Sequence, residues 1–194
     1  GMAFAILREH LHYHTRDELE GDPSRKQIIP YIVVLTQDHR VFTLRRRREQ
    51  SEARLHGKLS IGVGGHLERE DAEHDDPITA GMWREFAEEI LVPASTLDTL
   101  APIYRGVLND DSTEVGAVHL GVVFTVLVPE PQEIHVGEPE KMEGSWWRPV
   151  MLQEHADRLE TWSALLLGEL TQWWGPAREG ALWRQEMFER STQK

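Results

Sequence analysis

The segment over residues 61–92 constrains the fold of this chain more than any other part of the sequence. It opens with an apolar run that ends in a glycine cluster, residues 61–65, and this predicts a strand that leaves through a tight turn. An acidic loop follows, and after it Asp76 and Pro77 are residue types favoured at a helix N-cap and at the first helical position. The segment therefore predicts a strand, a glycine turn, an acidic loop and a helix over about 77–91.

The predicted helix has an apolar side and an acidic side. Its apolar residues recur every four positions and should pack into a core: Ile78, Met82, Phe86 and Ile90. Glu85, Glu88 and Glu89 have i, i+3 and i+4 spacing, so their carboxylates converge, and a divalent cation bound by oxygens would offset their repulsion. A solvated acidic face is the alternative for the glutamates alone. The glycine turn favours an ion or phosphate site, because glycines let the backbone approach such a ligand closely.

Two parts of this segment resemble the Nudix box, whose pattern is G-x5-E-x7-R-E-U-x-E-E-x-G-U with U apolar. Gly65 matches its first glycine, and residues 84–89 (Arg-Glu-Phe-Ala-Glu-Glu) match R-E-U-x-E-E in order, with Val92 as the final apolar residue. The stretch between these parts is five residues longer than the pattern, and Leu91 replaces the late glycine. The lone glutamate of the pattern therefore has four competing equivalents: Glu68, Glu70, Asp71 and Asp76.

The resemblance also implies a fold. The wider run over 61–90 is similar to a bacterial branch of the MutT-like Nudix proteins, a branch described as predicted phosphoesterases. An α+β fold follows, with a Nudix-type α/β/α sandwich and a mixed central sheet, whereas periodicity alone indicates only mixed α and β. We expect a single domain over residues 1–194, with a core from about 26 to 170 and a helical C-terminal extension over 171–194.

By the same resemblance, the helix carries a site for Mg²⁺ or Mn²⁺. Glu88 and Glu89 would be primary ligands, and the carbonyl of Gly65 would complete the shell. Glu85 would be a further ligand or the general base. Arg84, which lies four residues before Glu88, would hold that carboxylate in place.

Further site residues are expected outside the helix. The resemblance implies an outer metal ligand in the acidic loop, Glu68, and a ligand or base in the loop before a late strand, for which Glu140 and Glu143 are candidates. The candidates for binding substrate phosphate are Arg45, Arg47, Lys58 and Gly64. Arginine suits this role because its planar guanidinium matches phosphate oxygens, although a solvated strand end is an alternative for the arginine run over 45–48.

Apolar runs elsewhere predict the remaining elements. Strands are expected over 3–7, 28–36, 41–46, 58–63, 103–108, 117–128 and 146–150, and a helix over 151–170. The run at 117–128 is almost entirely apolar and should be a central strand.

The acidic turn 109–114, which contains Glu114, either closes a hairpin or lines the cleft. Aromatic residues over 173–188 would cover a homodimer interface or pack against the same domain. Three alternating histidines would bind a metal or form a polar surface: His10, His12 and His14.

Composition excludes several kinds of function. The formal net charge of −12 argues against general binding to nucleic acids or anionic membranes. The sequence has no cysteine, which excludes disulfides, thiolate metal sites and cysteine nucleophiles, and with them the cysteine-dependent isomerases of the superfamily. No apolar stretch is long enough to span a membrane and no signal-peptide pattern is present, so we expect a cytoplasmic location.

These observations lead to a functional expectation. The chain should be a metal-dependent hydrolase that cleaves a diphosphate linkage in a small-molecule substrate, of the nucleoside diphosphate-X type or related, by attack of water on phosphorus. The alternative is an inactive Nudix domain that senses a nucleotide or another ligand. Such domains usually lose carboxylates of the box, and here all three helical glutamates are present. The identity of the substrate stays open, because the box does not build the substrate pocket.

Overall fold

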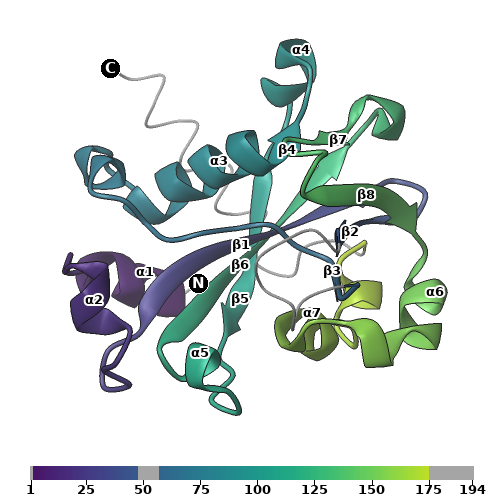
Figure 1. Ribbon diagram of the computed structural model, residues 1–194. Helices are drawn as coiled ribbons and strands as arrows, with labels where there is room; N and C mark the ends of the chain where they lie inside the picture. The colour runs from purple at the N-terminus through teal and green to yellow at the C-terminus, as the bar shows by residue number, and fades with distance from the viewer. Residues whose placement is uncertain (1, 48–56, 175–194) are drawn as a thin grey trace.

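The computed structural model describes residues 2–47 and 57–174, and it has a mixed sheet with helices on both faces (Figure 1). The elements in chain order are α1 (Met2–Glu9), α2 (Arg16–Leu19), β1 (Gln27–Thr36), β2 (Val41–Arg46), β3 (Leu59–Ser60), η2 (Glu70–Glu73), α3 (Pro77–Glu89), β4 (Ile90–Leu91), α4 (Ala94–Leu97), β5 (Pro102–Leu108), α5 (Glu114–Ala117), β6 (His119–Val128), η3 (Pro131–Glu133), β7 (His135–Val136), β8 (Met142–Trp147), α6 (Pro149–Glu154), η4 (Ala156–Arg158), α7 (Thr161–Leu166) and η5 (Leu170–Gln172). No helix in these described ranges is both long and apolar enough to cross a membrane.

The sheet is built around two parallel strands. Its order is β3-β2-β1-β6-β5, and β8 pairs along β2. Strands β1 and β6 are parallel, in register from Gln27↔His119 to Thr36↔Val128, while the other pairs in the sheet are antiparallel. The predicted hairpin between β1 and β2 and the predicted central position of β6 are therefore confirmed. Both central strands are almost continuously apolar because both of their faces are covered.

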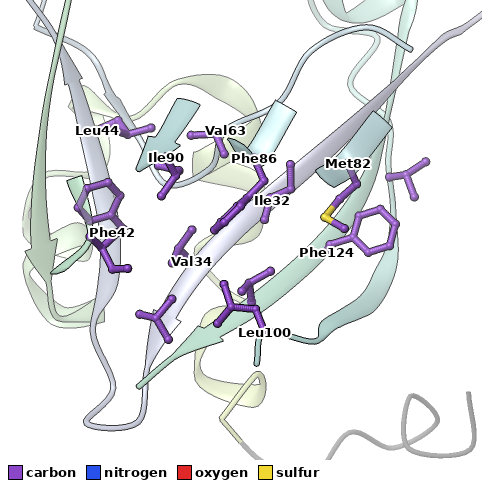
Figure 2. Packing of buried hydrophobic residues seen from close by; sticks show 14 of the residues in the cluster. Ile32, Val34, Phe42, Leu44, Val63, Met82, Phe86, Ile90, Leu100 and Phe124 are labelled. Atoms are coloured by element: carbon purple, nitrogen blue, oxygen red, sulfur yellow. The ribbon is translucent and has the colours of Figure 1, made fainter. Parts of the chain in front are cut away.

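Side chains of β1 alternate between two hydrophobic clusters, one on each face of the sheet. Ile32 and Val34 belong to the first cluster, with residues of α1 and α3; much of this cluster is drawn in Figure 2. Tyr31 and Val33 belong to the second, with residues of α6, α7 and η5. The mixed central sheet and the helical layers expected from the resemblance are thus confirmed, and the same strands anchor the segments that carry the candidate site.

The prediction of a strand over residues 3–7 was wrong, since this stretch lies within helix α1. Phe4 is buried, and its ring lies 5.0 Å from that of Tyr104, measured between centroids. Leu7, three residues later, packs against the same cluster, whereas Ile6 is 51% exposed. This burial follows helical rather than strand periodicity. The three histidines after α1 do not lie on a strand either, so they share no strand face.

The predicted continuous helix over 151–170 is broken into four short pieces, α6, η4, α7 and η5. The break occurs where Leu159 forms a parallel bridge with Leu59 and the Glu160 amide donates to the Leu59 carbonyl. The apolar stripe is nevertheless core, because its leucines are buried in the second cluster: Leu152, Leu159, Leu166 and Leu170. The strand predicted over 146–150 ends at Trp147, since Pro149 begins α6.

The C-terminal aromatic residues that are described pack against the domain itself. Trp173 is buried in the second cluster, and the Trp174 indole donates to the Thr36 carbonyl at 2.7 Å. Residues 175–194, most of the predicted helical extension, lie outside the described part of the chain.

Candidate active site

Helix α3 is fixed by a cap at its start and by the core along one side. The Asp76 carboxylate accepts the Thr79 amide at 3.2 Å and the Thr79 hydroxyl at 2.8 Å, and Pro77 occupies the first helical position, as predicted. Met82 and Phe86 are fully buried against the sheet (Figure 2). These anchors fix the rotation of α3 about its axis. The helix ends at Glu89, two residues earlier than predicted, because β4 pairs with β7.

The glycine turn approaches both the sheet and α3 closely. Val63 and Ile32 exchange backbone hydrogen bonds of 2.8 and 3.0 Å, which place the turn on the sheet. A Cβ on Gly64 would lie 1.9 Å from the Pro30 carbonyl oxygen. A Cβ on Gly65 would lie 2.4 Å from both carboxylate oxygens of Glu85. Glycine is needed at both positions, and the Gly65 backbone lies directly against the buried end of the acidic side of α3.

Arg84 connects the helix to the acidic loop. Its guanidinium donates to the Glu85 carboxylate at 2.7 Å, to the Asp71 carboxylate at 3.1 Å and to the His66 carbonyl at 2.7 Å. It also pairs with Glu88 at 3.3 Å, the contact that the resemblance implies. Burial alone would lower the pKa of Arg84, but the hydrogen bonds to Asp71 and Glu85 outweigh it and raise that pKa. Arg84 is therefore a fixed positive charge that orients the carboxylates around it.

Asp71 is the acidic-loop residue that meets Arg84 most closely. It is only 4% exposed, and it also accepts the Glu68 amide at 2.8 Å. It stands six residues after Gly65, the spacing of the lone glutamate in the Nudix pattern, so the five extra residues lie between Asp71 and Arg84. The other candidates have different surroundings: Glu68 is 3.9 Å from Arg84 and largely exposed, Glu70 is exposed, and Asp76 caps α3.

The three helical glutamates differ in their surroundings. Glu85 is buried, and this burial raises its pKa in spite of the opposing contact with Arg84. Glu89 is partly buried. Its pKa is also raised, first by burial and then by repulsion from Glu85 and Glu138. Glu88 lies on the exposed side. Two neighbouring carboxylates are thus held where their negative charges are poorly compensated, a setting that a bound cation would relieve.

The loop between β7 and β8 brings Glu138 toward the end of α3. The Gly137 amide donates to the Glu89 carbonyl at 2.8 Å, and the Glu138 carboxylate pairs with Lys141. Of the two glutamates predicted from this region, Glu140 is exposed in the loop, and Glu143 lies on β8, where it pairs with Arg45. Sequence reasoning did not select Glu138. Its only signal was that it comes directly after the glycine of this loop.

Of the predicted phosphate-binding residues, Arg45 lies on β2, Arg47 follows β2, Lys58 precedes β3 and Gly64 lies in the glycine turn. Arg45 pairs with Glu143 of β8 at 2.5 Å, and Arg47 is exposed, with its amide bound to the Lys141 carbonyl. Lys58 donates to the Asp157 carbonyl at 3.1 Å. Arg46, which was not selected, acts electrostatically on Glu89. The signal for Arg46 was alternation along the strand, because it shares the face of Phe42 and Leu44, which pack into the α3 cluster (Figure 2).

The residues present fit a hard divalent cation. Carboxylates from one helix turn and a glycine backbone form an oxygen donor set, the kind that Mg²⁺ and Mn²⁺ prefer. A Cβ at Gly65 would fill the space beside Glu85, so the cradle depends on glycine. Among residues 2–47 and 57–174, no three His, Asp or Glu side chains already form a cation cage. Mg²⁺ does not require one, since it usually keeps several waters and binds only one or two carboxylates together with substrate phosphates.

The predicted histidine cluster after α1 is dispersed. His10 contacts the Ile6 carbonyl through Nδ1 at 2.9 Å, and His14 lies 3.9 Å from Glu18. The turn 109–114 forms local contacts: the Asp110 carboxylate accepts the Ser112 amide at 3.0 Å, and Glu114 begins the short helix α5. The hairpin interpretation of this turn fits the antiparallel pairing of β5 and β6.

Comparisons with known proteins agree with this architecture. The chain is 34% identical to protein YmaB of Bacillus subtilis (strain 168) over 156 residues, which are 78% of this chain and 74% of YmaB. The structure matches that of Tm1382, a protein assigned to the Nudix hydrolases, with a TM-score of 0.70 and 28% identity over 87% of this chain and 82% of Tm1382. No family model matches the sequence.

A third similarity concerns the fold alone. The dihydroneopterin triphosphate pyrophosphohydrolase of E. coli matches with a TM-score of 0.51 and 16% identity, over 75% of this chain and 96% of that enzyme. The Nudix-box resemblance implies the same fold, and the glycine turn and α3 lie together as that resemblance implies. The chain therefore belongs to the family of protein YmaB, within the Nudix hydrolase superfamily.

Proposed function

We propose that this protein is a metal-dependent hydrolase that cleaves a diphosphate linkage in a small-molecule substrate by attack of water on phosphorus. The observation that carries the proposal is the close approach of the Gly65 backbone to the buried Glu85 carboxylate. Arg84 donates a hydrogen bond to this carboxylate, and the charge of Glu85 also acts on Glu89. Such a substrate carries high negative charge, so a site that cleaves it must neutralise that charge and align the nucleophile.

Mg²⁺ or Mn²⁺ is the cofactor that this donor set suits. Glu88 and Glu89 would hold it, with the Gly65 carbonyl and Glu85 alongside and Glu68 as an outer ligand. When bound, the ion would neutralise phosphate charge and lower the pKa of a coordinated water.

The chain's own residues would share the remaining tasks. Glu85 is suited to accept a proton from the attacking water, because burial raises its pKa while Arg84 fixes its orientation. Arg46, whose charge acts on Glu89 and which also pairs with Glu160 at 3.6 Å, is a further candidate to bind substrate phosphate beside Arg45, Arg47, Lys58 and Gly64. The charge of Glu138 acts on Glu89, and Glu138, Glu140 and Glu143 are all candidates for the additional ligand or base.

The test is release of phosphate or pyrophosphate, with Mg²⁺, from a panel of nucleoside diphosphate derivatives, nucleoside triphosphates and non-nucleotide diphosphates. Glu89→Gln should abolish turnover while the fold remains intact. Glu154→Gln, at an exposed glutamate of α6, is the matched control and should retain full activity. Equal turnover in Glu89→Gln and the unaltered protein would contradict the proposal.

Metal binding needs a measurement of its own. Mg²⁺ should raise the thermal unfolding midpoint more than NaCl does at equal ionic strength, and Glu89→Gln should reduce this shift. If the shift is present but no compound in the panel is hydrolysed, a ligand-binding role for the domain becomes the better explanation.

A further inference from the structure

A pair of histidines outside the carboxylate site has no role in the proposed reaction. His66 directly follows Gly65, and His119 begins β6. Their Nε2 atoms lie 3.0 Å apart, and their ring centroids are 5.1 Å apart with the planes at 66°. The two residues are far apart in sequence, so the tertiary fold brings these nitrogens together.

The hydrogen bond at Nδ1 of His119 determines which ring nitrogen of this residue carries the lone pair. His119 Nδ1 is 2.6 Å from the Val115 carbonyl oxygen, and this oxygen can only accept a hydrogen bond. Nδ1 therefore carries the proton, and Nε2 of the neutral ring presents a lone pair toward His66. An imidazole whose one nitrogen donates to a backbone carbonyl while the other is free to bind is the arrangement typical of a metal-ligating histidine.

The distance between the two Nε2 atoms fits a shared ion. Two nitrogens at about 2.1 Å from one metal are separated by about 3.0 Å if they subtend a right angle, and by about 3.4 Å in a tetrahedron. The observed 3.0 Å matches the right angle, which is typical of nitrogen ligands of Ni²⁺ and Cu²⁺. We propose that His66 and His119 bind one divalent transition-metal ion of this kind, at a site separate from the oxygen ligands of α3.

The surroundings define what such a site would be. Arg16 of α2 and Glu20, which directly follows this helix, pair with each other at 3.0 Å and are close enough to act electrostatically on His66. Within the described ranges no third His, Asp or Glu completes a cage, so water would have to fill the remaining positions around a bound ion. A bound ion would tie the residue after the glycine turn to the start of β6.

Titration of the tag-free protein with NiCl2 by calorimetry, with excess Mg²⁺ present, tests this proposal. One Ni²⁺ should bind per chain, and His66→Ala and His119→Ala should each weaken binding by about tenfold or more. His135→Ala, at an exposed histidine of β7, and the double variant His12→Ala/His14→Ala are the controls, and both should bind as the unaltered protein does. Loss of binding in the double variant instead would overturn the proposal.

Spectroscopy of the unaltered protein gives a second readout that does not depend on a variant folding. Electron paramagnetic resonance of bound Cu²⁺ should show coupling to two imidazole nitrogens, and to one in His119→Gln. If the unaltered protein shows one imidazole or none, or if both alanine variants bind Ni²⁺ normally, the pair is only a hydrogen bond from neutral His66 to His119. Neither readout depends on hydrolase activity.

Discussion

At the scale of single residues, Gly64 of the glycine turn has little freedom to change. Gly64 faces the backbone carbonyl of Pro30, which cannot move without disturbing β1, and this explains why the position requires glycine. We expect Gly64→Ala to lower the free energy of unfolding by about 2–3 kcal/mol, because the added carbon overpacks against a rigid neighbour. Urea denaturation measures the change. Gly21→Ala is the control, since a Cβ there meets nothing within 4 Å, and equal stability of the two variants would contradict this account.

Asp71 provides a second prediction at this scale. Asp71→Asn removes the charge that faces Arg84 in a buried position, so we expect a loss of about 2 kcal/mol in the free energy of unfolding at pH 7. Glu68→Gln changes an exposed carboxylate 3.9 Å from the same arginine and should alter stability by less than about 0.5 kcal/mol. Denaturant melts of both variants test this. A larger loss of stability for Glu68→Gln than for Asp71→Asn would mean that Glu68, and not Asp71, anchors Arg84.

The candidate site could be predicted from the sequence only where its residues belong to one continuous segment of the chain. The spacing of Gly65, Arg84 and the glutamates is a property of one turn and one helix, and it was readable in the sequence. Arg46 and Glu138 required knowledge of which face of β2 meets α3 and which loop reaches its end. Alternation along β2 puts Arg46 on the face opposite Arg45, but it does not say which of the two faces meets α3.

At the scale of elements, long apolar strands were predictable because burial on both faces leaves a continuous apolar run. Strands β1 and β6 follow such runs closely. Short segments were not predictable in this way. Five apolar residues at the start of the chain suit a strand or a helix equally, and only the packing of Phe4 against Tyr104 decides between them. Likewise, the pairing of Leu159 with Leu59 interrupts a stripe that otherwise has helical spacing.

A helix and a strand over residues 3–7 predict different effects of substitutions at Phe4 and Ile6. In a strand, Phe4 and Ile6 would lie on one face, whereas the helix buries Phe4 and leaves Ile6 51% exposed. We therefore expect Phe4→Ala to cost about 3 kcal/mol of unfolding free energy and Ile6→Ala less than about 1 kcal/mol. Guanidinium denaturation of both variants is the measurement, and equal losses would favour the strand.

At the scale of the whole molecule, the second hydrophobic cluster connects the C-terminal helices to β1 and to the segment that leads into the glycine turn. Ser163 of α7 joins these three segments, because its hydroxyl oxygen accepts the Ile61 amide at 3.0 Å and lies 3.0 Å from the Tyr31 hydroxyl. Ile61 leads into the glycine turn, and Tyr31 is on the central strand β1. The C-terminal helices therefore support the turn from the face of the sheet opposite α3.

This connection should give the molecule a specific weakness at alkaline pH. Burial raises the pKa of Tyr31 to about 12, although hydrogen bonds with Ser163 and Ser60 oppose the shift. The unfolded chain loses this proton near pH 10 and the folded chain only near pH 12, so the unfolded state binds fewer protons in between. Stability from this group is complete below about pH 10 and should fall by about 2–3 kcal/mol as the pH rises to about 12.

Denaturant melts of the unaltered protein and of Tyr31→Phe between these pH values measure the effect. The phenylalanine variant starts less stable, because it lacks the hydroxyl that meets Ser163, but it should lose less stability as the pH rises. The difference in slope isolates Tyr31 from other groups that titrate in this range, since those groups are common to both proteins. Parallel pH profiles would mean that the Tyr31 hydroxyl reaches solvent before global unfolding, and that the contact with α7 opens independently of the rest of the fold.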